Sequence, residues 1–330
     1  MCSSDLAGIY QKVEGSSSTS AIQCYRRAGE LLEWLTRAED NLGTFVSLDL
    51  LAAAAYQLGG LPAMSSALLG KVRIDSLGEQ LYANFLRGDF DEVLMIVSQF
   101  WKDNIEITDR EAPARILNED GDDKTSWYFT VELVRVLGGI ADALRRGDSH
   151  RLNRIMNKLE ALDKLALRIF SDEASMLVML LYQVATSYCE SSIYEPIRQI
   201  AELKPERTDR LERFARTQFN RKRGILWTSQ RHGISRLIEE SSFALCTPTG
   251  SGKTLVANIA LVKELLLRED YGLAPLALYL VPSRALAGEV EAKLTSELGQ
   301  DMIITGLYGG ADWGITDYWL DADQPTVLIA

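Results

Sequence analysis

The sequence predicts an α-helical domain followed by an α/β domain built on a doubly wound parallel sheet. Residues 7–203 are rich in Ala and Leu, and their apolar residues recur every three or four positions, which is the period of a buried helix face. From Ile225 onward, short apolar runs alternate with helical or irregular stretches, which is typical of parallel strands covered on both faces. We therefore expect a helical accessory domain at 7–203, a basic linker helix at 204–224 and the α/β domain at 225–330.

The helical region contains a weak internal repeat, in which predicted helices end at glycine. Apolar helical stretches stop at Gly59-Gly60, at Gly88 and at Gly147, and a Pro or Asp then opens a new helix. Such an array of helical hairpins resembles tetratricopeptide-type repeats, although no full consensus repeat is present. An irregular helical domain without repeat geometry is the alternative.

Charge is distributed unevenly along the chain, whose formal net charge is −11. Ten basic and three acidic residues lie between Lys204 and Arg236, whereas five basic and thirteen acidic residues follow from Leu237 to Ala330. The chain as a whole is therefore not expected to bind polyanions, but the basic segment is a candidate.

Residues 204–223 predict a basic amphipathic helix, because Lys and Arg side chains surround one apolar face. The apolar face consists of Leu211, Phe214, Ala215 and Phe219. This helix is expected either to link two domains as a solvated segment or to contact nucleic acid or an acidic domain.

The positions of the cysteines and histidines limit which kinds of site the chain can contain. The four cysteines and two histidines are scattered without metal-ligand spacing, which argues against a zinc site or a disulfide framework and favours a reducing cytoplasm. The sequence has no apolar stretch long enough to span a membrane and no signal-peptide pattern at its N-terminus. We expect a cytoplasmic protein without a membrane partner.

The motif with the clearest chemistry is a phosphate-binding loop at Thr247-Pro248-Thr249-Gly250-Ser251-Gly252-Lys253-Thr254. An apolar run at Phe243–Cys246 predicts a buried strand before it, and residues 255–262 predict a helix after it. The glycines let backbone N–H groups and the helix N-terminus face phosphate oxygens. Lys253 would contact the β- and γ-phosphates of ATP, and Thr254 would bind Mg²⁺. The strict pattern has Gly where Thr247 stands, and a glycine-rich turn that binds nothing is the alternative.

Three further features lie around this loop in a fixed order. Leu226-Trp227-Thr228-Ser229-Gln230 precedes it, Pro282-Ser283-Arg284-Ala285-Leu286-Ala287 follows the next predicted strand, and Gly309-Gly310 follows the one after. Together they resemble the first RecA-like domain of superfamily 2 DEAD/DEAH-type (DExH) helicases, and most of all the processive branch that includes archaeal repair helicases. That family often has Thr-Pro-Thr-Gly-Ser-Gly-Lys-Thr as its phosphate loop, so Thr247 fits it.

The resemblance assigns roles that residue chemistry supports. It implies that Gln230 reads the adenine edge, since an amide both donates and accepts. Ser283 and Arg284 would hold phosphates of a single strand, and Gly309 and Gly310 would let that strand approach the backbone. Trp227 would pack near the base or in the core. The alternatives are a surface amide for Gln230, a surface charge for Arg284 and a plain turn for the glycine pair.

The sequence departs from the family after its last predicted strand, Thr326–Ile329. Neither the Thr-Pro-Glu-type nucleic-acid motif nor the Asp-Glu-x-His/Asp strand occurs in the α/β region. The carboxylate that positions Mg²⁺ and water, and the arginine finger of a second RecA-like domain, are the main electrostatic contributions to hydrolysis. We therefore expect an N-terminal helicase fragment with an incomplete RecA-like domain, which by itself shows no nucleic-acid-stimulated ATPase activity.

The leading interpretation is part of an ATP-dependent helicase that uses ATP and Mg²⁺ and acts on single-stranded nucleic acid, DNA rather than RNA. The domain layout is similar to helicase subunits of bacterial anti-phage systems such as Hachiman, which implies a role in antiviral defence and a nuclease or other defence subunit as protein partner of the helical domain. Two alternatives are a helical-repeat scaffold with a nucleotide-binding switch domain and the motor of a nuclease-coupled translocase.

Overall fold

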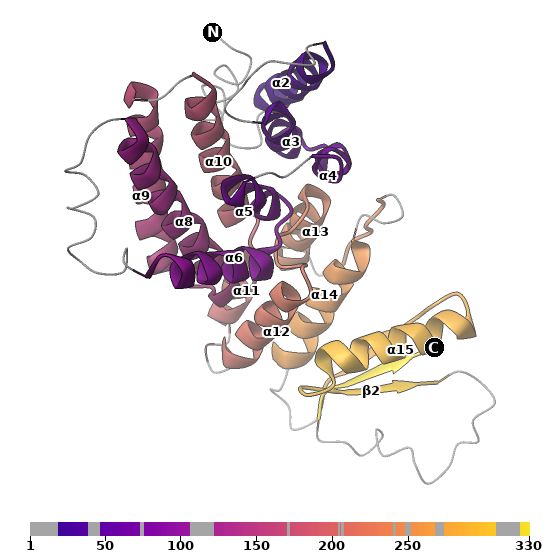
Figure 1. Cartoon of the computed structure of the whole chain (residues 1–330). Helices are drawn as coiled ribbons and strands as arrows, with labels where there is room; N and C mark the ends of the chain where they lie inside the picture. Colours follow the sequence, from indigo (N-terminus) through magenta and orange to yellow (C-terminus); the bar gives the residue numbers. More distant parts are fainter. Residues whose placement is uncertain are drawn as a thin grey trace. The chain divides into compact units, whose positions relative to one another are not determined.

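A computed structural model of the chain describes residues 19–38, 47–72, 76–105, 122–169, 172–203, 205, 208–239, 242–247, 252–267, 274–307 and 324–330. The chain divides into two compact units, Met1–Glu190 and Ser191–Ala330. The first unit is helical, and the second combines helices with a parallel sheet, as the ribbon of each shows (Figure 1). The predicted order of an α-helical region and an α/β region is therefore confirmed.

The described elements of the first unit are all helices. They are α2 (Thr19–Ala38), α3 (Leu48–Leu58), α4 (Pro62–Leu69), α5 (Leu77–Leu86), α6 (Phe90–Asp103), α8 (Asp122–Arg146), α9 (Ser149–Ile169) and α10 (Asp172–Glu190). Neighbours in sequence pack together, as α2 does on α3 and α8 on α9, and α10 also packs on α3. In the described ranges no helix is long and apolar enough to cross a membrane.

Glycines end three of these helices, as the sequence predicted. Gly60, Gly88 and Gly147 follow α3, α5 and α8 with φ of +69°, +68° and +69°, a region that costs glycine little. The next residue in each case donates its N–H to a carbonyl five residues earlier, for example Asp89 to Asn84 at 3.0 Å. This is the Schellman arrangement, which satisfies the last carbonyls of a helix. The tetratricopeptide resemblance itself stays a prediction.

An aromatic cluster joins the middle of the first unit to its last helix. The rings of Phe85, Phe90 and Tyr188 lie 5.6 to 6.0 Å apart between centroids. The buried Tyr188 hydroxyl donates to the Leu86 carbonyl at 2.7 Å, so the end of α5 and the end of α10 are tied together. Rings and hydrogen bond together fix contacts between segments about a hundred residues apart in sequence.

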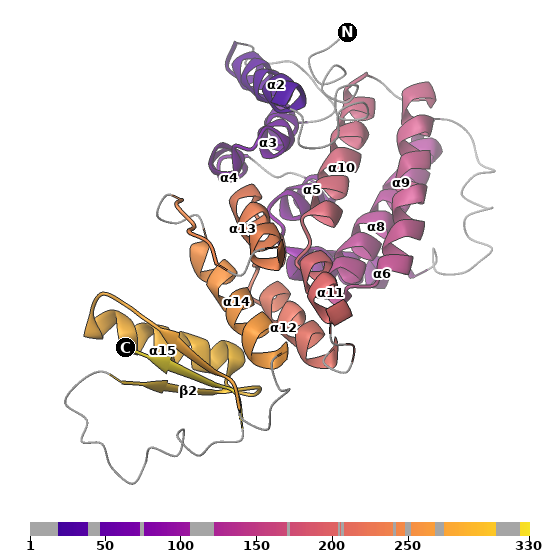
Figure 2. The same ribbon diagram turned by 180° about the vertical axis from the view of Figure 1, so that it is seen from behind.

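The second unit contains α11 (Tyr194–Leu203), α12 (Thr208–Asn220), α13 (Thr228–Glu239), α14 (Lys253–Leu267), β1 (Leu276–Tyr279), α15 (Arg284–Leu298), β2 (Ile303–Gly306) and β3 (Thr326–Ile329). Its sheet is parallel with the order β1-β3-β2, so the last strand lies in the middle and is buried. α15 packs against β2 and β3, as Figures 1 and 2 show.

One predicted strand is absent from the described sheet. Phe243–Cys246 has no strand assignment, and its side chains alternate between half-buried and exposed instead of being buried. The described strands pair only with one another, β3 lying between β1 and β2. An apolar run becomes a strand only where a partner strand satisfies its backbone groups, and within the described residues this run has no such partner. The strand prediction at Phe243–Cys246 is therefore wrong for this structure.

The division between the units lies at Glu190, ahead of the predicted end of the helical domain at residue 203. Ser192 and Ile225 form an antiparallel bridge, with Leu226 N donating to Ser191 O at 2.7 Å and Ile193 N donating to Gly224 O at 2.9 Å. This bridge joins the start of α11 to the segment before α13, so the residues between them belong to the second unit. The bounds 7–203, 204–224 and 225–330 otherwise stay predictions.

The predicted basic helix is α12, and it is anchored on both sides. Its expected apolar face is buried, with Leu211, Phe214, Ala215 and Phe219 each exposed by 5% or less. Several of its basic residues, with those that follow it, pair with acidic residues of the same unit. Arg213 contacts Asp301 at 3.2 Å, and Arg221 and Arg223 contact Glu297 at 2.9 and 3.0 Å. The helix thus makes an acidic contact within its own unit.

Glu297 joins two helices of the second unit, α14 and α15, to the segment that follows α12. Its side chain is fully buried in α15, and its second oxygen accepts from Asn258 Nδ2 of α14 at 2.8 Å. Arg221 also donates to the Ser296 carbonyl at 3.0 Å. A buried carboxylate is tolerated because these donors replace the water that it lost.

We expect Glu297→Ala to destabilise the second unit by about 2–3 kcal/mol, because it leaves the buried Asn258 amide and two guanidinium groups without their acceptor. This loss is smaller than the roughly 3–5 kcal/mol expected for a fully buried pair, because both arginine side chains keep partial access to water. Hydrogen exchange of α14 and α15 peptides across a urea series would measure it. The matched variant Glu289→Ala, at an exposed position of the same helix, should change stability by less than about 0.5 kcal/mol. Equal destabilisation by the two changes would contradict this role.

Candidate nucleotide and nucleic-acid site

The phosphate loop is described at its two ends. Pro248, Thr249, Gly250 and Ser251 lie outside the described residues, whereas Thr247 and Gly252 to Thr254 lie within them. Gly252 has φ of +79°, and α14 begins directly after it at Lys253. Lys253 Nζ donates to the Thr247 carbonyl at 2.6 Å, so the lysine reaches back across the loop. Lys253 and Thr254 are exposed at the helix N-terminus, where an anion is favoured.

Gln230 connects α13 to this loop. It is buried, with 7% of its surface exposed; its Oε1 accepts from Trp227 N at 2.8 Å and its Nε2 donates to Gly252 O at 3.3 Å. A Cβ on residue 252 would lie 2.1 Å from Gln230 Nε2, so the amide would have to move away from its present contacts. The φ of +79° by itself favours glycine at this position. The alternative of a surface amide is wrong for Gln230.

Close packing of α13 on α14 presents Gln230 to the loop. A Cβ added at Gly233 would lie 3.3 Å from Val256 and 3.4 Å from Leu245, so the helix approaches both segments closely. Further along, Lys263 Nζ donates to the Leu237 carbonyl at 2.6 Å. These two contacts hold α13 against α14 at the middle of α13 and near its C-terminal end.

Trp227 lies just before α13 and is 53% exposed. The alternative of a core tryptophan is therefore wrong. Its backbone N–H is held by the Gln230 side chain, so the indole is offered to solvent beside the end of the phosphate loop. An exposed aromatic ring near the phosphate loop is of the right kind to pack on a base, as the sequence predicted.

The residues predicted to bind a single strand begin α15. Ser283 is the N-cap of this helix, and its hydroxyl accepts from Leu286 N at 3.4 Å. Arg284 is the first helical residue and is exposed. Both follow the carboxyl end of β1, where Val281 N donates to Ala330 O at 2.8 Å after β3. Ligands of open α/β sheets bind outside this edge. Gly309 and Gly310 lie outside the described residues.

A bound metal would rely on the nucleotide. Among the described residues no group of three His, Cys, Asp or Glu could hold a metal ion. Mg²⁺ usually keeps several waters and binds substrate phosphates with one or two protein groups. The exposed Thr254 hydroxyl is of the right kind for such a contact, and the arrangement fits Mg²⁺ that arrives with ATP.

Comparison with known proteins agrees with this geometry. Residues 227–330 match the DEAD/DEAH box helicase family. This part of the chain is similar to DEAD/DEAH box helicase domains. The phosphate loop, Gln230, Arg284 and the incomplete RecA-like sheet all fall within the matched residues, in agreement with the predicted resemblance and fold class.

Two relatives extend the comparison. Hachiman protein HamB of Bacillus cereus is 24% identical over 323 residues, which are 94% of this chain and 27% of HamB. The ATP-dependent helicase Lhr-Core of Methanocaldococcus jannaschii is 36% identical over 91 residues, which are 27% of this chain and 11% of Lhr-Core. The chain thus spans about a quarter of the length of HamB and a smaller share of Lhr-Core. The HamB match includes the helical unit as well as the helicase domain.

The sequence analysis did not identify Glu297 and Asn258, whose hydrogen bond joins the two helices that carry Lys253 and Arg284. Asn258 lies on the helix that Lys253 begins, and Glu297 on the helix that Arg284 begins. A signal was present, because Glu297 stands three residues after Leu294 and next to Leu298 on the buried face of α15. A charged residue at such a position indicates a buried polar contact.

Cys246 provides a probe of the site, because it is exposed and directly precedes the phosphate loop. We expect Mg²⁺-ATP to slow its alkylation by iodoacetamide. Cys189 should stay largely unmodified with or without nucleotide, because burial raises its pKa to about 12. About one such thiol in ten thousand is ionised at pH 8, and only the thiolate reacts. Peptide mass spectrometry would follow both sites. Unchanged Cys246 labelling under saturating nucleotide would contradict the placement of the nucleotide.

Proposed function

We propose that this chain is the ATP-binding and strand-binding part of an ATP-dependent nucleic-acid helicase or translocase. The observation that carries the proposal is the convergence of Gln230, Gly252 and Lys253, supplied by α13, the loop and the first residue of α14. Lysine charge, helix N-terminus and a buried amide are the groups that a nucleoside triphosphate needs.

Each residue then has a defined task in binding. Lys253 exchanges its contact with the Thr247 carbonyl for phosphate oxygens, and Thr254 offers its hydroxyl to Mg²⁺. The Gln230 side chain is already fixed by its hydrogen bonds to Trp227 and Gly252, so little conformational entropy is lost when it contacts the adenine. When bound, Mg²⁺ neutralises charge on the transferred phosphate.

The proposed substrate class and partners are supported by the similarity to DEAD/DEAH box helicases and to the two relatives. The proposed nucleic-acid ligand is a single strand, DNA rather than RNA, held through phosphates by Arg284, with Ser283, Gly309 and Gly310 beside it. The similarity to Hachiman HamB supports a role in antiviral defence, with a nuclease or other defence subunit bound through the helical unit. We place the protein in the cytoplasm. Residues 1–330 alone are proposed to bind ATP without turning it over.

We expect Lys253→Ala to weaken binding of Mg²⁺-ADP by about 1.5–3 kcal/mol, the value of a charge-assisted contact to phosphate. Isothermal titration calorimetry of residues 1–330 measures this directly. The matched variant Lys293→Ala removes the same charge from α15 and should leave the affinity unchanged. If wild type and Lys253→Ala bound Mg²⁺-ADP with equal affinity while the fold stayed intact, Lys253 would not contact the phosphates.

Arg284→Ala should weaken binding of single-stranded DNA about equally for different sequences, since a phosphate contact reads no base. The slope of log affinity against log salt should flatten by about 0.7, the value for one phosphate on a single strand. Fluorescence anisotropy of the full-length protein with labelled oligonucleotides measures the slope. Arg27→Ala, an exposed arginine of the helical unit, serves as the control. An unchanged slope would leave Arg284 as an ordinary surface charge.

A further inference from the structure

The outward face of α9 is basic, although it belongs to an acidic unit. Residues 1–190 contain 28 acidic and 19 basic residues, whereas α9 contains five basic and two acidic ones. Basic side chains separated by four or fourteen positions share one side of this helix. They are exposed at Arg154, Lys158, Lys164 and Arg168, and we call this side the basic face of α9.

The carboxylates near the basic face neutralise only part of its charge. Of the two acidic residues of α9, one is half-buried on the opposite side and the other contacts Lys164 at 2.8 Å. Lys158 contacts the buried Glu132 of α8. Within the part of the chain that the structure describes, Arg154 and Arg168 form no ion pair. Their charges therefore remain available to a ligand.

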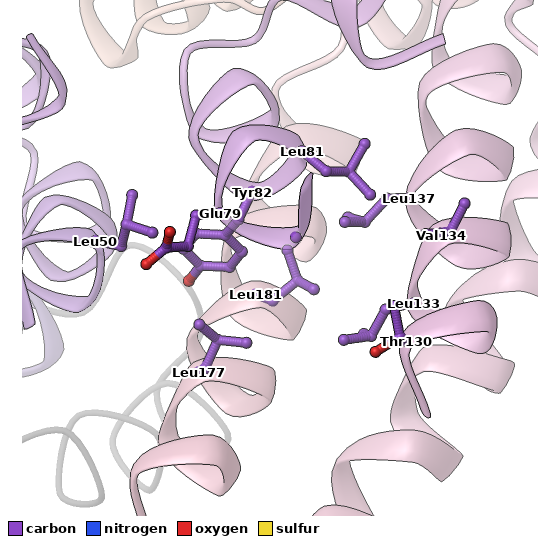
Figure 3. A pocket seen from close by; sticks show the side chains of 11 residues that line it. Leu50, Glu79, Leu81, Tyr82, Thr130, Leu133, Val134, Leu137, Leu177 and Leu181 are labelled. Carbon is purple, nitrogen blue, oxygen red and sulfur yellow. The ribbon is translucent and has the colours of Figure 1, made fainter. Parts of the chain in front are cut away.

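The opposite side of α9 is apolar and packs on α8 and α10. Leu159, Leu162 and Ala166 are buried there. Other sides of α8 and α10 line an apolar cavity of about 150 Å³ together with α3 and α5, as Figure 3 shows. None of the described residues that line this cavity belongs to α9. The basic face is thus a surface feature, separate from the core of the unit.

The other residues of the helix indicate which polyanion fits the face. Asn153 and Asn157 are exposed between the charges, and side-chain amides donate to phosphate oxygens. α9 contains no Phe, Tyr or Trp, whereas sites for a single strand combine charge with aromatic rings on which bases stack. A duplex keeps its bases stacked inside and presents phosphates. From Arg154 to Arg168 the helix rises about 21 Å, which is the length of roughly six base pairs.

We propose that the basic face of α9 binds the phosphate backbone of double-stranded DNA without reading its sequence. Arg154 and Arg168 contact phosphates directly, and Lys158 and Lys164 add positive potential between them. The duplex is a second ligand, distinct from the single strand proposed for the α/β unit, and its binding does not require Arg284. The choice of DNA over RNA rests on the function proposed above.

Fluorescence anisotropy of the chain with a labelled DNA duplex of about 20 base pairs, measured over a salt series, tests this proposal. Replacing both arginines (Arg154→Ala with Arg168→Ala) should flatten the slope of log affinity against log salt by about 1.8, the value of two phosphate contacts on a duplex. Two duplexes of unrelated sequence should lose affinity equally. Arg154→Lys with Arg168→Lys keeps both charges and should keep the slope. Circular dichroism checks that each variant folds.

The matched control removes the same charge from α2. Arg27→Ala with Arg37→Ala replaces two exposed arginines and should leave the slope unchanged. The proposal is wrong if the wild type binds no duplex, or if the slope survives the loss of Arg154 and Arg168. Binding of polyglutamate in place of the duplex, with the same dependence on these two arginines, would overturn it in favour of an acidic protein. Single-strand binding is tested separately by Arg284→Ala, so the two proposals can fail independently.

Discussion

The buried carboxylate of Glu297 is the constraint on which the second unit depends. It accepts from Arg221, Arg223 and Asn258, and so joins the end of the basic segment, α14 and α15. Removing a carboxylate from water is costly, and only an arrangement that supplies all these donors repays the cost. The helices are thereby held in one relative position, which sets the N-termini that carry Lys253 and Arg284. A polar contact remote from the ligands thus supports both proposed sites.

Gly252 fixes the geometry at the end of the phosphate loop in two ways. Its φ of +79° allows the chain to turn into α14, and the missing Cβ leaves room for the Gln230 amide. One glycine therefore serves the loop conformation and the approach of α13. Gln230 in turn holds the Trp227 backbone, which leaves the indole exposed beside the loop. The contacts proposed for base, phosphate and magnesium would therefore come from residues that lie close together.

The helical unit is organised by different means. Glycines in the left-handed region end α3, α5 and α8, and aromatic rings with the Tyr188 hydroxyl bring α5 and α10 together. These contacts are apolar or neutral, and they add to the ion pairs that the buried Glu132 carboxylate makes with Arg135 and Lys158. The similarity to HamB covers both units.

The sequence by itself determined the order of a helical and an α/β region, the glycine helix ends, the phosphate loop and the helicase family, because each depends on local residue types at fixed spacing. It also predicted the apolar face of α12. The tertiary structure decided which segments pair and which side chains are buried, because the spacing of apolar residues along the chain does not specify contacts between distant segments. Phe243–Cys246 forms no strand, because pairing depends on a partner distant in the chain. Gln230 is buried and Trp227 is exposed because of how α13 lies on α14. Arg221 and Arg223 contact Glu297 because a buried carboxylate needs donors to replace the water that it lost.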